Sequence, residues 1–289
     1  MKNTIKVILG LGLSFMLFLI MNVHTAEASS NKEDALKEKG YTSEDISKMN
    51  ESTKDQLIEN QGRKAEYEVT ATEYYNSTDG KKYKVTDQNR EKIYKIRDQD
   101  LAKYAAENGI SIMEITPPVQ GISSRMGTDS YSDDKIVFSA FVDKSKTVGS
   151  EYEYAAFVDF NWKKMASVAF FDEIALAWDN RFIGLTKTLS GYYISGSGSH
   201  GDKLKKDQEL YGISARFVLI KSLNLSGGIS QNIRVGTNYK GQTGKFQAKY
   251  VHTLIPFPGS VSLGPASVDV PAGWSNQEFK LDFNLKIGS

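Results

Sequence analysis

A glycine- and serine-rich loop contains a serine, a histidine and an aspartate close together in the sequence. Ser199, His200 and Asp202 lie in the run Gly-Ser-Gly-Ser-His-Gly-Asp that spans residues 196–202. Such residues form a hydrolytic triad only when rigid elements hold them in contact, and a flexible loop gives little support of that kind. The chain also lacks the Gly-x-Ser-x-Gly motif of a nucleophile elbow. We therefore interpret this segment as a strand connection and predict no catalytic residue in it.

Paired carboxylates are a second kind of candidate, because two acidic residues that flank a sugar can hydrolyse a glycosidic bond. Asp172-Glu173 and Asp133-Asp134 are adjacent pairs. Neighbouring strand residues point to opposite faces, so one member of each pair is expected to be ordinary surface charge. Glu151 and Glu153 share a strand face with Asp159, and we expect that face to be solvated. An extracellular hydrolase that uses Asp172 or Glu173 remains an alternative.

Metal and cofactor chemistry has little support in the residue types present. Asp129, Asp133 and Asp134 form the densest acidic loop and offer oxygen ligands of the kind that Ca²⁺ prefers. Their spacing does not match an EF-hand and lacks its closing glutamate, so the presence of a metal stays open. The chain has no cysteine, which excludes a thiolate nucleophile, cysteine-ligated zinc, an iron–sulfur cluster and disulfides. We predict no cofactor.

Two further segments are candidate contacts for a membrane or another charged partner. Thr186–His200 is rich in threonine, serine and glycine, like the hairpins of β-pore-forming toxins, but its alternation fails at Tyr192-Tyr193. A pore-forming protein is therefore a weaker alternative, and membrane contact has little support. The lysines of residues 203–206 are interrupted by nearby acids. The whole chain has 36 basic and 35 acidic residues, which argues against a nucleic-acid partner.

The elements that must position these residues are mainly strands. From Ile110 onward apolar residues recur at every second position, which is typical of antiparallel sheet with one buried face. With turn-like stretches between them, about ten strands predict an antiparallel β-sandwich-like body. His252 lies on an apolar row, so we expect it to be buried and hydrogen-bonded. The rows are Tyr152 to Trp162, Ile174 to Trp178, Tyr211 to Leu219, Phe246 to Leu254 and Phe279 to Ile287.

A charged helical segment is expected to precede this body, over residues 29–65. Thr42 followed by Asp45, and Ser52 followed by Asp55, are N-terminal capping signals for two or three short helices. Their narrow apolar faces are compatible with two roles. The segment is either a solvated helical extension that packs on the main body or stays mobile, or a docking module for another protein.

The next segment is predicted to form a hairpin and a helix. Tyr67–Tyr75 and Lys82–Thr86 flank a turn that contains Asp79-Gly80, a strong hairpin signal. Asp98–Asn108 has an apolar face at helical spacing, and Gly109 stands where a helix cap is expected. We assign residues 66–289 to one β-rich domain.

The N-terminus has the features of a signal peptide. Lys2 and Lys6 precede the apolar run Val7–Val23, and Ala26-Glu27-Ala28 has the small-x-small form that signal peptidase accepts. We expect residues 1–28 to be a signal peptide cleaved after Ala28, and the mature protein to be secreted. Cleavage removes two lysines and one glutamate, which leaves equal numbers of basic and acidic residues.

Two blocks carry a resemblance: Ala169–Trp178, and Lys249–His252 continuing through Ala272-Gly273-Trp274 to Ile287. They resemble segments of uncharacterised secreted β-rich proteins of Gram-positive bacteria. The resemblance implies export and an all-β body, and it carries no catalytic motif. Together these observations predict a secreted, non-enzymatic β-rich protein that binds an unknown ligand at the cell envelope or extracellularly.

Overall fold

The computed structural model describes most of the expected mature chain. The described residues are 31–109, 111, 125–127, 130–132, 136–163, 171–196, 198–220, 222, 224–255 and 275–289. The expected signal peptide and the acidic loop residues Asp129, Asp133 and Asp134 lie outside them. Within the described residues, no helix is both long enough and apolar enough to cross a membrane.

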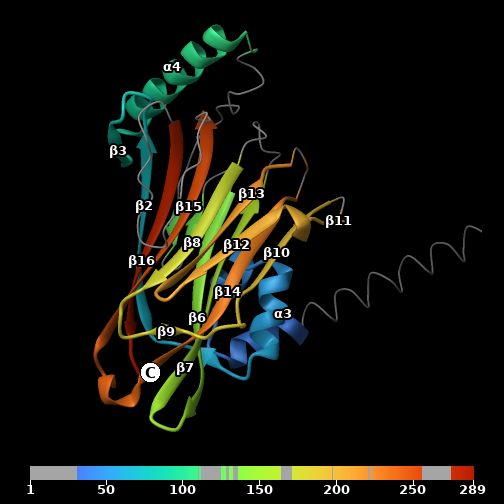
Figure 1. Cartoon of the computed structure of the whole chain (residues 1–289), viewed down its shortest axis with the longest axis vertical. Helices are drawn as coiled ribbons and strands as arrows, with labels where there is room; N and C mark the ends of the chain where they lie inside the picture. The colour runs from blue at the N-terminus through green and yellow to red at the C-terminus, as the bar shows by residue number, and fades with distance from the viewer. Residues whose placement is uncertain are drawn as a thin grey trace, which may run out of the picture.

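Two antiparallel sheets pack face to face, which confirms the predicted β-sandwich (Figure 1). The nine-stranded sheet A has the order β11-β10-β14-β7-β6-β5-β4, with β1 beside β6 and β9 beside β14. The seven-stranded sheet B has the order β12-β13-β8-β15-β16-β2-β3. The strands of sheet A are β1 (Arg63–Lys64), β4 (Arg125–Gly127), β5 (Ser130–Ser132), β6 (Ile136–Val148), β7 (Glu151–Trp162), β9 (Ile183–Gly184), β10 (Ser190–Ser195), β11 (Gly198–Ser199) and β14 (Ser226–Gly236). Those of sheet B are β2 (Tyr67–Asn76), β3 (Lys82–Val85), β8 (Phe171–Trp178), β12 (Leu204–Glu209), β13 (Gly212–Val218), β15 (Thr243–Ile255) and β16 (Ser275–Lys286).

The core lies between the sheets and is built from the predicted apolar rows. The even-numbered row of β7, from Tyr152 to Trp162, faces the inward rows of β8, β13, β15 and β16. Phe160 stacks on Phe217 across the core at a ring-centroid distance of 4.7 Å. Gly227 on β14 lets this ring approach, since a Cβ there would lie 2.7 Å from a Phe160 ring carbon. Tyr211 departs from its predicted row, because it lies at an exposed hairpin tip just before β13.

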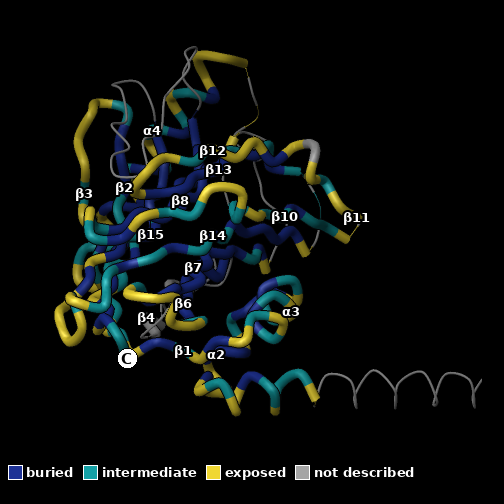
Figure 2. Tube along the Cα trace, turned by 60° about the horizontal axis from the view of Figure 1, so that its bottom comes forward, coloured by how far each residue is buried: buried dark blue, intermediate teal, exposed yellow. Residues whose placement is uncertain are grey.

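The N-terminal segment forms short helices, as predicted, and they cover the outer face of sheet A (Figure 2). Residues 31–38 are helical, followed by α2 (Ser43–Lys48) and α3 (Glu51–Glu59). Thr42 and Asp45 form the predicted capping box. The prediction for Ser52 is wrong: the N-cap is Asn50, and α3 begins at Glu51, two residues earlier than expected. Apolar helix residues pack on the outward side chains of β6 and β7, so the segment docks on its own sheet: Leu36, Tyr41, Ile46, Met49 and Leu57.

The predicted hairpin is present as β2 and β3, and the predicted helix is longer than expected. α4 spans Arg90–Asn108 and ends at Gly109, whose φ of 65° suits glycine. It begins earlier because Asn89 closes a turn, in which Thr86 N donates to Asn89 Oδ1 (2.8 Å), and because Ile93 extends its apolar face. Asp100 accepts hydrogen bonds from Tyr75, Ser77 and Thr78, which ties α4 to the hairpin. Two short 3-10 helices, η1 (Gly201–Lys203) and η2 (Thr237–Tyr239), complete the described elements.

Candidate binding groove

The serine, histidine and aspartate of the glycine-rich loop do not form a visible triad in the described part of the chain. His200 Nε2 lies 2.8 Å from Ser195 Oγ, and its ring meets the edge of the Tyr193 ring. The side chain of Asp202 lies outside the described residues. The histidine therefore contacts the strand β10 that precedes it, which is consistent with a strand connection.

The prediction that His252 is buried and hydrogen-bonded is confirmed. His252 is 4 % exposed, and its Nδ1 lies 3.0 and 3.1 Å from the two carboxylate oxygens of Asp172. Tyr250 Oη donates to the same carboxylate, Thr253 N donates to it at 3.1 Å, and Trp162 Nε1 donates to Tyr250 Oη at 2.9 Å. Asp172 has no exposed surface. A buried carboxylate with this many donors ties β8 to β15 inside the core.

The acidic residues expected on a solvated outer face are instead buried or paired. Glu173 is 5 % exposed and accepts from Arg216 Nε at 2.5 Å, so the expectation of ordinary surface charge is wrong for it. Glu153 is also 5 % exposed and accepts from Arg234 at 2.9 and 3.0 Å, whereas Glu151 remains partly exposed. Arginines on neighbouring strands supply the compensating charge that such burial requires. Asp159 is buried for a different reason.

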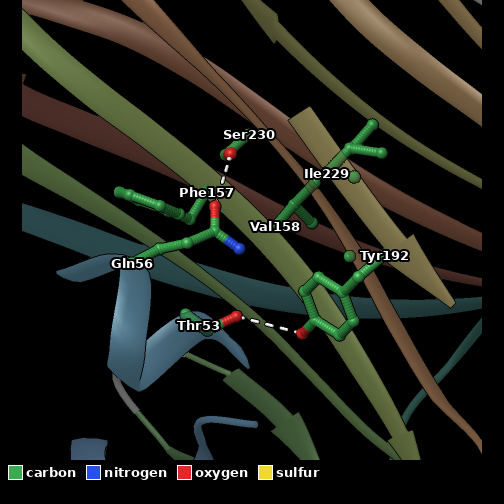
Figure 3. Close-up of a pocket in the computed structure, with 9 residues that line it drawn as sticks. Thr53, Gln56, Phe157, Val158, Tyr192, Ile229 and Ser230 are labelled. Carbon is green, nitrogen blue, oxygen red and sulfur yellow. Dashed lines mark hydrogen bonds between the residues drawn. The ribbon is translucent and has the colours of Figure 1, made fainter. Parts of the chain in front are cut away.

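Asp159 lies beneath the N-terminal helices. Asn50 N donates to its carboxylate at 3.3 Å, and Asn50 Nδ2 donates to Tyr192 Oη at 2.9 Å. Thr53 Oγ1 lies 3.0 Å from the same hydroxyl (Figure 3). Burial raises the pKa of Asp159 to about 7, and hydrogen bonds from Thr53 and Asn50 oppose this only in part. The space under α3, between Thr53, Gln56 and Tyr192, is too small to hold a water molecule.

A second acidic group lies in the same interface. Burial raises the pKa of Asp143 to about 6, although Tyr41 donates a hydrogen bond to it and Lys39 and Lys64 lie nearby. Asn60 Nδ2 also approaches this carboxylate, at 3.5 Å. The interface of the helices with sheet A thus contains two carboxylates, and its polar contacts are used within the chain.

A larger groove lies along β2, where β3 gives way to α4. Its volume is about 350 Å³. β2 forms one wall, and the other is formed by the end of β3, the turn that follows it and the first residue of α4. The lining residues are Thr70, Ala71, Thr72, Glu73, Lys84, Val85, Thr86, Asp87, Gln88 and Arg90.

The charged groups in this groove are held in place by their neighbours. Glu73 is 3 % exposed and accepts from Tyr94 Oη at 2.9 Å and from Gln277 Nε2 at 3.2 Å. Arg90 extends between Glu73 (4.0 Å) and Asp87 (2.5 Å). Positioned polar groups from a strand and a helix, next to apolar Ala71 and Val85, are typical of ligand sites.

Sequence motifs did not predict this groove, because its residues come from three different elements: a strand, a turn and the start of a helix. The available signal was the predicted hairpin followed by Asn89, a residue that favours turns. Among the described residues, no three histidine or acidic side chains converge as metal ligands. The possible Ca²⁺ ligands lie outside those residues.

No family model and no curated protein matches the sequence. Several solved structures match parts of the chain at low similarity. One is the collagen-binding subdomain of the Enterococcus faecalis surface protein ACE, at 10 % identity and a TM-score of 0.27, covering 37 % of this chain and 86 % of that one. Another is the collagen-binding domain of the Erysipelothrix rhusiopathiae surface protein RspB, at 7 % identity and a TM-score of 0.33. The match covers 50 % of this chain and 48 % of that one. A third is the RrgB pilus backbone of Streptococcus pneumoniae, at 9 % identity and a TM-score of 0.30. The match covers 39 % of this chain and 45 % of that one. These matches are partial and score below 0.5, so the β-sandwich assignment rests on the strand pairings of this chain.

Proposed function

We propose that the protein is secreted and acts as a non-enzymatic binding protein, with its ligand site in the groove between β2, the turn after β3 and the start of α4. The observation that carries the proposal is the groove itself: about 350 Å³, beside a sheet edge, with a buried, hydrogen-bonded Glu73 in its lining. The ligand is expected outside the cell or at its envelope, because the N-terminus has the features of a signal peptide.

The arrangement of the other polar groups supports binding over hydrolysis. Asp172 and Glu173, the carboxylates of the hydrolase alternative, are each occupied by contacts within the fold. Asp172 lies in the core and Glu173 pairs with Arg216. The groove, by contrast, combines the exposed residues Thr70, Asp87 and Gln88 with Glu73 and Arg90, which their neighbours hold in place.

A capture experiment tests the proposal. The immobilised protein is incubated with purified cell wall, membrane vesicles and secreted proteins, and the bound material is analysed. Thr70→Trp fills the groove at an exposed strand position, and Thr147→Trp makes the same change at an exposed position of β6 on the other sheet. We expect capture by the wild type and by Thr147→Trp, and its loss in Thr70→Trp. Equal capture by the two variants, or no captured ligand, would contradict the proposal.

A further inference from the structure

Among the described strands, none pairs with one side of β2 over about half of its length. On one side, β2 pairs with β16 from Asn76 to Tyr67 without a register shift. On the other side, β3 pairs only with residues 73–76 (Figure 1). In the described part of the chain, no strand pairs with residues 67–72 on that side. This open edge borders the groove, because Thr70, Ala71 and Thr72 belong to both.

The direction of each backbone group follows from two hydrogen bonds at the ends of β2. Lys286 N donates to Glu66 O, so even-numbered residues direct their backbone groups to β16. Ser77 N donates to Lys81 O, so odd-numbered residues direct theirs to the β3 side. Backbone N–H and C=O groups alternate in this way along an antiparallel strand. Val69 and Ala71 therefore present their donors and acceptors at the open edge.

β3 stops short for a local reason. If β3 continued in its register, residues 86–89 would face residues 72–69 of β2. Instead, Thr86 O accepts from Asn89 N and Arg90 N, and Asn89 Nδ2 donates to Lys84 O at 3.0 Å. This turn directs the chain into α4. The position that a longer β3 would occupy is left to another strand.

The two edges of sheet B differ in how they are protected. The far edge strand, β12, carries exposed Lys205, Lys206 and Asp207, and charges of this kind discourage added strands. The open edge of β2 has the sequence Tyr-Glu-Val-Thr-Ala-Thr, with no proline, no lysine and no bulge. Valine and threonine favour strands. The chain thus protects one edge and leaves the other able to pair.

We propose that the β2 edge binds an extended peptide, which adds to sheet B as a strand antiparallel to β2 and in line with β3. Main-chain hydrogen bonds to Val69 and Ala71 supply affinity, as in other cases of strand addition. The outer row of the edge consists of Glu68, Thr70 and Thr72, and Glu68 is exposed. An opposite charge next to it across the strands is favourable, so the peptide carries a lysine or arginine on this face.

This inference rests on the proposed function, since it names the ligand class of the same groove. Two synthetic eight-residue peptides serve as probes, both with valine at alternate positions. One has lysine and the other glutamate among the intervening positions. Binding is measured by titration, and amide hydrogen exchange is measured residue by residue with and without peptide. Ala71→Pro removes an edge N–H without removing a bond to β16. Thr147→Pro, the same change at an exposed position of β6 on the other sheet, is the control.

The expected result is binding of the lysine peptide, with slower exchange at the Val69 and Ala71 amides and little change at Glu68 and Thr70, which already pair with β16. Ala71→Pro is expected to weaken binding about tenfold, or about 1.4 kcal/mol, and Thr147→Pro to leave it nearly unchanged. Methylation of alternate peptide nitrogens is expected to abolish binding.

Three results would overturn strand addition: no binding of either peptide, binding that leaves Val69 and Ala71 exchange unchanged, or tighter binding of the glutamate peptide. Analytical ultracentrifugation that shows a dimer formed through this edge would also overturn the assignment, because a second copy of the chain would then occupy the edge. If the capture experiment still shows ligand loss in Thr70→Trp, the groove remains a binding site and only its ligand class is wrong. If capture also fails, both proposals fall.

Discussion

The Asp159 carboxylate under α3 leads to a quantitative pH prediction. Burial raises its pKa to about 7 in the folded protein, against 3.8 for an unperturbed aspartate. Because the folded-state pKa is the higher one, the stabilising contribution is complete below about pH 4 and is lost as the pH rises through about 7. At 1.36 kcal/mol per pKa unit, linkage gives a loss of about 2.5 kcal/mol between pH 5 and pH 8.

Asp159→Asn isolates this contribution. The amide keeps the shape of the side chain and an oxygen that accepts from Asn50 N, but it does not titrate. We expect the stability advantage of the variant over the wild type to grow by about 2.5 kcal/mol between pH 5 and pH 8. Hydrogen bonds from Thr53 and Asn50 of the helical segment lower the pKa of Asp159, and the Asp159 carboxylate in turn raises the pKa of Tyr192.

Urea denaturation followed by tryptophan fluorescence at both pH values is the assay. Asn161→Gln, a change at a non-titrating side chain of the same strand, is the control and adds no pH dependence of its own. Asp143 contributes a smaller change of the same sign, common to all three proteins. Parallel stability curves for wild type and Asp159→Asn would refute the reasoning, because Asp159 would then not be buried as described.

Three further changes test the fold. Gly227→Ala places a Cβ 2.7 Å from the Phe160 ring and should cost about 2 kcal/mol of stability, measured by urea denaturation. The comparison variant is Gly241→Ala, where the added Cβ meets no neighbour and only the φ of 82° opposes alanine. Arg216→Ala leaves the buried Glu173 without its guanidinium and should cost about 2 kcal/mol of stability, a loss that Glu173→Gln in the same chain should reduce. Asp100→Ala removes the acceptor for Tyr75, Ser77 and Thr78 and should make α4 exchange its amides faster than β16 does; equal exchange would contradict its role in holding α4.

The strand rows could be predicted because burial on one face imposes a period of two. The row from Phe279 to Ile287 and the row from Tyr152 to Trp162 both lie in the core as expected. The capping box at Thr42 was equally readable, since it depends on residues three apart. These features are local, and the sequence contains all the information that they need.

The burial of the outer-face acids could not be predicted in the same way. Asp159 is covered by helices more than a hundred positions away in the sequence, and Glu153 and Glu173 are each paired with an arginine on another strand. Alternation shows which residues share a face, but it does not show what covers that face. The groove was missed for a related reason, because it exists only where β3 stops and α4 begins.

The central claim is that the groove and the adjoining β2 edge bind the ligand of this protein. Hydrogen exchange of the protein alone and with the captured ligand fraction tests it most directly. The account predicts slower exchange at the Val69 and Ala71 amides and at residues 85–90, with the rest of the described chain unchanged. Protection confined to another surface, such as the exposed hairpin tip at Leu210 and Tyr211, would contradict it.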